Sequence, residues 1–158
     1  MVANMLGINC IVAHGNANNT YHTWNIVQID GATYHLDATY AVSDYTKQKQ
    51  MCYDYLNMSD SDVATTHQSR YPVPRCTSTR HNYYVVNNLV ATNADDIRRI
   101  VTNSTGKTIV FKYDGIYTND VHSAAQECCN WIHYYHKRAK NVAYVYSPSY
   151  RICKVSYK

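Results

Sequence analysis

The segment HTWNIVQIDGATYHLDATY, from His22 to Tyr40, decides the fold prediction. Two runs rich in β-branched and aromatic residues, 22–29 and 32–40, flank the dipeptide Asp30-Gly31. Asp-Gly is favoured in the two-residue type I′ turns that join antiparallel strands. The segment therefore predicts a β-hairpin whose register is set by its turn.

That register places several polar side chains together on one face of the hairpin. Trp24 is expected opposite Asp37 and His22 opposite Thr39, which makes His22 and Asp37 diagonal neighbours. A carboxylate bonded to one imidazole nitrogen fixes the tautomer, and the other nitrogen can deprotonate a thiol. His22 and Asp37 are thus a candidate catalytic base and its orienting acid, with a purely structural hydrogen bond as the alternative.

The same segment resembles the signature of the transglutaminase-like family: His-x-Trp-Asn, a strand, Asp-Gly, and a strand reading aromatic-His-x-Asp-x-Thr-aromatic. Upstream, Leu6-Gly7-Ile8-x-Cys10 and Gly15 are similar to the segment that the family places before this signature. Downstream, Ser59-Asp60 with His67 and the stretch 74–84 resemble bacterial members. The resemblance covers roughly residues 5 to 90 and is ungapped through the hairpin.

The resemblance implies an α+β fold with a papain-like, transglutaminase-like core built on an antiparallel sheet. It also implies acyl transfer or amide hydrolysis on a protein or peptide substrate. In that chemistry His22 is the base and Asp37 orients it, while Trp24, Thr39 and His35 are expected to line the cleft. No cofactor is implied.

The family's nucleophilic cysteine begins a helix whose end resembles Asn4-Met5-Leu6-Gly7. At 3.6 residues per turn, that cysteine would lie on the order of ten residues before Met1. The chain as given is therefore expected to lack the nucleophile and the N-terminal helical part, and to be inactive. Cys10 and Cys76 are weak substitutes. A fragment, a misassigned start and a true pseudoenzyme remain open explanations.

An alternative function comes from composition. The chain has 17 Tyr and a single Phe, and tyrosines suit half-buried surfaces and clefts. A non-catalytic binding module that holds peptide or glycan in a Tyr-rich cleft would use such a surface. Because the expected core lacks a covering helix, a homodimer that buries the uncovered face is a further expectation.

We expect residues 1–92 to form the core and 93–158 an α/β extension. In the core, strands are predicted at 8–13, 53–58 and 82–86, a loop at 15–19, and a helix cap at Ser59. In the extension, helices are predicted to begin after Asn93 and after Asn119 or Asp120, the second running to Lys140, with strands at 107–113, 141–146 and 150–157.

The charge of the chain argues against nucleic-acid binding. Lys and Arg number 15 against 11 Asp and Glu, a formal net charge of +4, and most basic residues are scattered. The only tight group is Lys137, Arg138 and Lys140, which is expected to cap a helix C-terminus.

The cysteines and histidines predict no metal site. Six cysteines form no C-x-x-C pair, so a zinc ribbon is not supported, and three disulfides or buried free thiols both remain open. His133 and His136 have no third ligand at a motif-like spacing. No run reaches the length of a membrane span, and Met1 to Gly7 lacks the basic region of a signal peptide. Localisation stays undetermined, with a secreted or cell-surface parent protein as one option.

Overall fold

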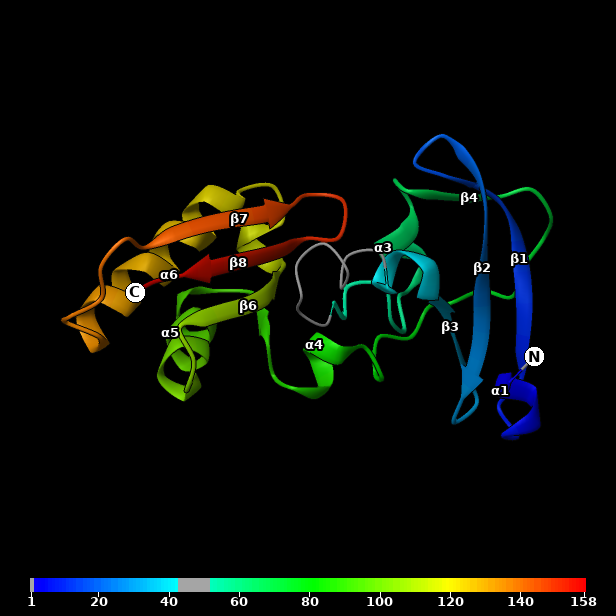
Figure 1. Cartoon of the computed structure of the whole chain (residues 1–158), viewed down its shortest axis with the longest axis horizontal. Helices are drawn as coiled ribbons and strands as arrows, with labels where there is room; N and C mark the ends of the chain where they lie inside the picture. Colours follow the sequence, from blue (N-terminus) through cyan, green and yellow to red (C-terminus); the bar gives the residue numbers. More distant parts are fainter. Residues whose placement is uncertain (1, 43–51) are drawn as a thin grey trace. The chain divides into compact units, whose positions relative to one another are not determined.

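The computed structural model describes residues 2–42 and 52–158 of the chain (Figure 1). It divides into two compact units, Met1–Val86 (unit 1) and Asn87–Lys158 (unit 2), each with its own sheet. The division falls slightly before the predicted boundary after residue 92, because the short strand Val90–Ala91 pairs within unit 2. The predicted α+β class is confirmed.

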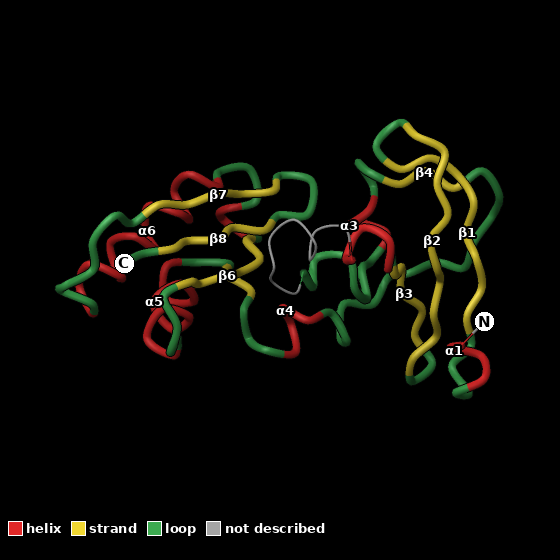
Figure 2. Tube along the Cα trace, in the orientation of Figure 1, coloured by secondary structure: helices red, strands yellow, loops and turns green. Residues whose placement is uncertain are grey.

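Unit 1 is built on a curled antiparallel sheet with the strand order β3-β2-β1-β4 (Figure 2). Short helices complete it within the described residues. The elements are α1 (Val2–Met5), β1 (Cys10–Ala17), β2 (Thr20–Ile29), β3 (Ala32–Leu36), α3 (Asp60–Val63), β4 (His67–Ser69) and α4 (Tyr83–Val86).

The predicted hairpin is present, with Ile29 paired to Ala32. Asp30 and Gly31 have φ of 48° and 76°, as a type I′ turn requires. A second tight turn lies at Asn18-Asn19, where φ is 49° and 65°. The predicted loop at 15–19 is therefore wrong for its first three residues, which continue β1.

The strand predicted at 32–40 is too long and the one predicted at 82–86 is wrong, because in each an Asx side chain begins a helix instead. β3 ends at Leu36, and residues 38–42 are helical because the Asp37 carboxylate accepts the N–H of Tyr40. In the same way Asn82 accepts the N–H of Tyr84, and 83–86 form α4 rather than a strand. The expected strand pairs of Asp37 and Thr39 therefore do not form.

The predicted strand at 53–58 is also wrong. It is reduced to one isolated bridge between Met58 and His35, with N···O distances of 2.9 Å in both directions. The predicted cap is present, since Ser59 and Asp62 form a capping box at the start of α3.

Unit 2 contains the predicted α/β extension. Its sheet has the order β5-β6-β8-β7, in which β5 and β6 are parallel and the other pairs are antiparallel. Asn93 and Asp120 cap the two long helices, but the second helix ends at Tyr135 rather than Lys140. The elements are β5 (Val90–Ala91), α5 (Ala94–Asn103), β6 (Thr108–Tyr113), η1 (Gly115–Tyr117), α6 (Val121–Tyr135), β7 (Ala143–Ser147) and β8 (Ile152–Ser156).

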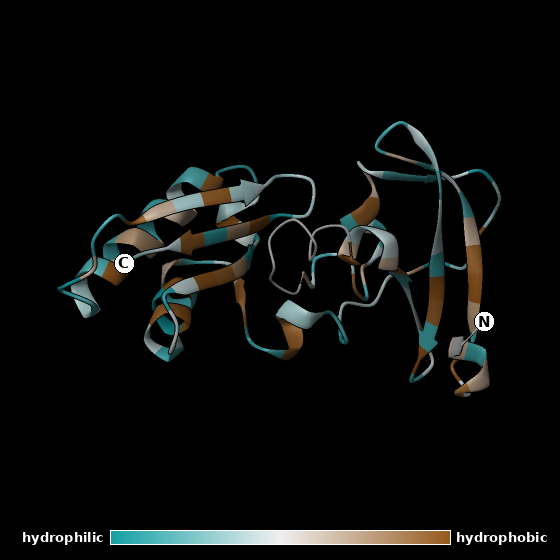
Figure 3. Cartoon of the chain, in the orientation of Figure 1, coloured by the Kyte–Doolittle hydropathy of each residue, from teal (hydrophilic) through white to brown (hydrophobic). Residues whose placement is uncertain are grey.

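The core of unit 2 lies between one face of this sheet and the two helices. Ile109 and Phe111 of β6 are buried in one cluster with Ile97 of α5 and Ile132 of α6. Figure 3 shows hydrophobic residues, in brown, along the strands and helices of this unit. None of the six cysteines forms a disulfide; Cys10 and Cys52 are half-buried and the other four are buried. Cys128, Cys129 and Cys153 belong to the core of unit 2. Among the described residues, no helix is long and apolar enough to cross a membrane.

Candidate functional site

A buried carboxylate lies at the centre of the candidate site in unit 1. The side chain of Asp37 has no exposed surface, and its Oδ2 lies 2.7 Å from Nε2 of His22 and 3.1 Å from Nε2 of His67. Its Oδ1 accepts the N–H of Tyr40 at 3.1 Å. Burial raises the pKa of Asp37, but the hydrogen bonds from His67, Tyr40 and His22 outweigh it and hold the pKa below its usual value. Asp37 is therefore an ionised acceptor between two imidazoles.

Three separate segments deliver these side chains. His22 lies on β2, Asp37 directly follows β3, and His67 begins β4. The approach of β4 to β1 depends on Gly15, because a Cβ there would lie 2.0 Å from the carbonyl oxygen of Gln68. A glycine in the middle of β1 thus lets a distant strand bring His67 to Asp37.

His22 keeps one nitrogen available for chemistry. A carboxylate only accepts hydrogen bonds, so the Nε2 of His22 carries the proton and Nδ1 is the basic nitrogen of the neutral ring. No hydrogen bond occupies Nδ1 within residues 2–42 and 52–158. The ring is stacked on Tyr40 at 4.8 Å between centroids, and its side chain is 14% exposed. His22 is therefore a positioned base that solvent can reach.

His67 differs from His22 because both of its nitrogens are engaged. Nε2 contacts Asp37, Nδ1 lies 2.9 Å from the hydroxyl of Thr66, and the side chain is fully buried. It anchors the carboxylate and cannot itself reach a substrate. Sequence reasoning noted His67 only within the family resemblance and did not place it at Asp37, since its contact joins residues 30 positions apart in the chain.

A second network, which runs from the buried Trp24 and His35 to the surface, supports the site from within the unit. The indole N–H of Trp24 donates to Nδ1 of His35 at 3.0 Å, so the proton of His35 is on Nε2, which donates to Asp60 at 3.0 Å. Asp60 also accepts from Arg75 and from the backbone N–H of Cys76. Burial lowers the pKa of His35 and favours its neutral form.

The structure separates the three residues that were expected to line a cleft. Trp24 and His35 are only 3% and 4% exposed, whereas Thr39 lies at the surface. Trp24 packs beside His22 with ring centroids 6.4 Å apart. Trp24 and His35 thus hold the base in position, and Thr39 is the member of the three that a ligand could contact.

Neither suggested substitute cysteine is placed as a nucleophile. Burial raises the pKa of the fully buried Cys76 to about 11, and burial also raises the pKa of Cys10. Both thiols are therefore protonated at neutral pH, and the thiol form is a poor nucleophile. Within the described part of the chain no hydrogen bond joins a cysteine to His22.

Among the residues that the structure describes, two groups of side chains have donor atoms close enough to hold a metal ion. They are His22, Asp37 and His67, and His35, Asp60 and Cys76, with donor atoms within 4.8 Å of one another in each group. In both groups the histidine nitrogens are already engaged with carboxylate oxygens at 2.7 to 3.1 Å. A metal would have to displace those protons, so the arrangement fits hydrogen-bond networks better.

Comparison of the sequence with models of known protein families and with curated proteins gave no match.

Proposed function

We propose that His22 and Asp37 are the base half of a transglutaminase-like acyl-transfer site, acting on a glutamine carboxamide or a peptide bond. One observation carries the proposal: the Nε2–H of His22 is held on a buried, ionised carboxylate while its Nδ1 has no partner among the described residues. The resemblance of segment 22–40 to the transglutaminase-like signature supports the same assignment.

In this reaction a thiol supplies the attacking atom. Nδ1 of His22 takes the thiol proton, and the thiolate sulfur forms a bond to the carbonyl carbon. As the carbon–nitrogen bond breaks, His22 returns the proton to the leaving ammonia or amine, which leaves a thioester. Water or an amine then attacks the thioester and releases the thiol. Asp37 keeps His22 in the required tautomer and stabilises the imidazolium between these steps.

The test separates the base from the thiol by adding the thiol as a reagent. The protein is incubated with 2-mercaptoethanesulfonate and a p-nitrophenyl ester of an N-acylated glutamate side chain, and nitrophenolate release is followed. General-base catalysis contributes about 10²–10⁴-fold, so His22→Ala is expected to remove most of any acceleration above the thiol-only rate. His14→Ala, at an exposed histidine of the same sheet, is the matched control.

A structural readout accompanies the rate. In ¹⁵N NMR, His22 is expected as the Nε2–H tautomer, and Asp37→Asn is expected to weaken that preference along with the rate. Equal rates for the unchanged protein and His22→Ala would overturn the proposal. Peptide binding that persists in His22→Ala and Asp37→Ala, without acceleration, would favour the non-catalytic binding module instead.

A further inference from the structure

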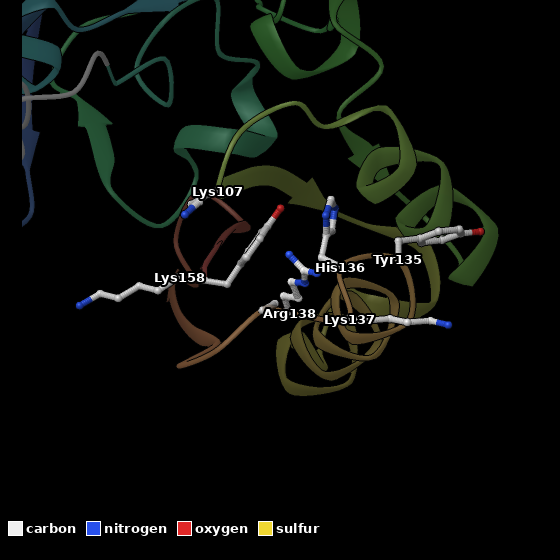
Figure 4. A pocket seen from close by; sticks show the side chains of 8 residues that line it. Lys107, Tyr135, His136, Lys137, Arg138 and Lys158 are labelled. Carbon is white, nitrogen blue, oxygen red and sulfur yellow. The ribbon is translucent and has the colours of Figure 1, made fainter.

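A second candidate site lies entirely within unit 2, at the end of its sheet. A cavity of about 460 Å³ opens where β6 begins, β8 ends and the chain leaves α6 (Figure 4). This volume falls in the range of roughly 300–1,000 Å³ that is usual for small-molecule sites. The cavity is therefore of a size to hold a small ligand.

The charge of the lining is all of one sign. Lys107, Lys137, Arg138 and Lys158 line the cavity, and no Asp or Glu does. Within residues 2–42 and 52–158, none of these four cations is engaged in an ion pair. Four cations around one concavity repel one another, and a bound anion relieves that repulsion.

The frame of the cavity is fixed by backbone hydrogen bonds. Lys140 and Lys158 exchange N–H···O bonds of 2.7 and 2.8 Å, and the N–H of Tyr157 donates to Lys107 at 3.0 Å. The buried ring of Tyr157 lies 5.2 Å from that of His136, and its hydroxyl donates to Gly106. The three segments that carry the cations are thus held together before any ligand arrives.

The side chains differ in how they face the cavity. In Figure 4, Arg138 extends toward His136, whereas Lys137 and Lys158 extend outward on opposite sides. The Arg138 guanidinium has the planar fork of donors that matches phosphate oxygens in pairs. Arg138 and the half-buried His136 accordingly lie together in the lining, and the side chains of Lys137 and Lys158 lie farther out.

We propose that this cavity binds a small polyphosphate, either inorganic or carried by a nucleotide. The excess of cations calls for a ligand with several negative charges, and the single concavity favours a compact one over an extended nucleic-acid strand. The sequence predicted that Lys137, Arg138 and Lys140 interact with a helix C-terminus. Lys107 and Lys158 lie next to β6 and β8, so that role does not explain their presence around the cavity. The proposal is independent of the function assigned to unit 1.

The experiment is calorimetric titration of the full chain with sodium tripolyphosphate, with ATP free of divalent metal, and with a single-stranded DNA 8-mer. Saturable binding of tripolyphosphate that weakens between 50 and 300 mM NaCl is expected. Equal affinity for ATP would assign the site to phosphate groups alone, and tighter ATP binding would assign it to a nucleotide; both support the proposal.

Three variants sharpen the test. Arg138→Gln and Lys107→Gln are each expected to weaken tripolyphosphate binding about tenfold, the usual effect of a charge-assisted hydrogen bond. Lys140→Gln is the matched control, because Lys140 neighbours Arg138 in sequence but does not line the cavity. No binding at millimolar tripolyphosphate would overturn the proposal, as would equal losses in all three variants or tighter, Arg138-dependent binding of the DNA.

Discussion

The two units of this chain use their ionisable residues in opposite ways. Unit 1 has five Lys and Arg against six Asp and Glu, a net charge of −1, whereas unit 2 has ten against five, a net charge of +5. Unit 1 buries His35, Asp37, Asp62 and His67 in its interior. Unit 2 keeps nearly all its charges outside a core of aliphatic, aromatic and cysteine side chains.

The two units are therefore stabilised by different kinds of interaction. Apolar burial in unit 2 is non-directional and tolerates approximate packing. The networks around Asp37 and Asp60 in unit 1 are directional, and each is weakened strongly when a buried partner is removed. We therefore expect unit 1 to be sensitive to charge and pH, and unit 2 to be sensitive to volume. Trp24 and Trp131, one in each unit, allow the two to be followed separately.

The largest expected effect is that of Asp37→Ala on unit 1. The change leaves two histidines and one backbone N–H without their common acceptor, and losing one partner of a buried pair costs about 3–5 kcal/mol. Urea unfolding followed by the fluorescence of Trp24, in a Trp131→Phe background, measures it. The corresponding variant of the core of unit 2, Ile132→Ala, is expected to lower the stability of unit 2 by about 3 kcal/mol. Parallel shifts of both transitions by either variant would contradict the comparison.

A smaller effect is expected from mild acid. Burial lowers the pKa of His35 from its ordinary 6.5, so the unfolded chain binds a proton more readily than the folded one. Unit 1 should keep its full stability above pH 6.5 and lose part of it as the pH falls toward the folded pKa of His35. Asp37 and Asp60, whose pKa values are lowered by their hydrogen bonds against the opposing effect of burial, add a further loss below about pH 4.

His35→Gln offers a control for this pH effect. A glutamine amide can accept from Trp24 and donate to Asp60, as His35 does, but it does not titrate. The variant should flatten the stability of unit 1 between pH 6.5 and 5 in urea titrations. If the stability of unit 1 still falls with pH in His35→Gln, a group other than His35 is responsible for the pH dependence.

The smallest effect is expected for Arg75→Ala. Arg75 pairs with Asp60 at 2.8 Å, but its side chain is 84% exposed, and exposed pairs contribute less than about 1 kcal/mol. The loss should shrink further in 0.5 M NaCl. A salt-insensitive loss above 2 kcal/mol in the unfolding of unit 1 would show that Asp60 depends on Arg75 more than its exposure suggests.

The sequence predicted the turns and helix starts that are determined by a few neighbouring residues. Asp30-Gly31 set both the hairpin and its register, and Asn93 and Asp120 marked the two long helices. The strand predicted at 32–40, which ends at Leu36, and the strand predicted at 82–86, which is a helix, failed for a shared reason. Aromatic and β-branched residues favoured a strand, while Asp37 and Asn82 acted as helix caps within those runs.

The sequence predicted only that part of the candidate site which a local turn brings together. His22 and Asp37 lie on one hairpin, so turn geometry brought them together in the prediction as in the structure. His67 and the engagement of His35 with Asp60 depend on contacts between distant segments, which no local pattern encodes. Gly15 was predicted in a loop rather than in a strand, so its role in admitting β4 beside β1 was not predicted.

The close approach at Gly15 also has an evolutionary consequence. Because β4 can lie against β1 only when position 15 lacks a side chain, Gly15 and His67 depend on each other although Gly15 pairs with Ser69 and His67 with Ala17. In a set of diverged relatives the two positions should covary. Lineages that replace the glycine should also lose the second histidine, while His22 and Asp37, joined by the hairpin, persist as a pair.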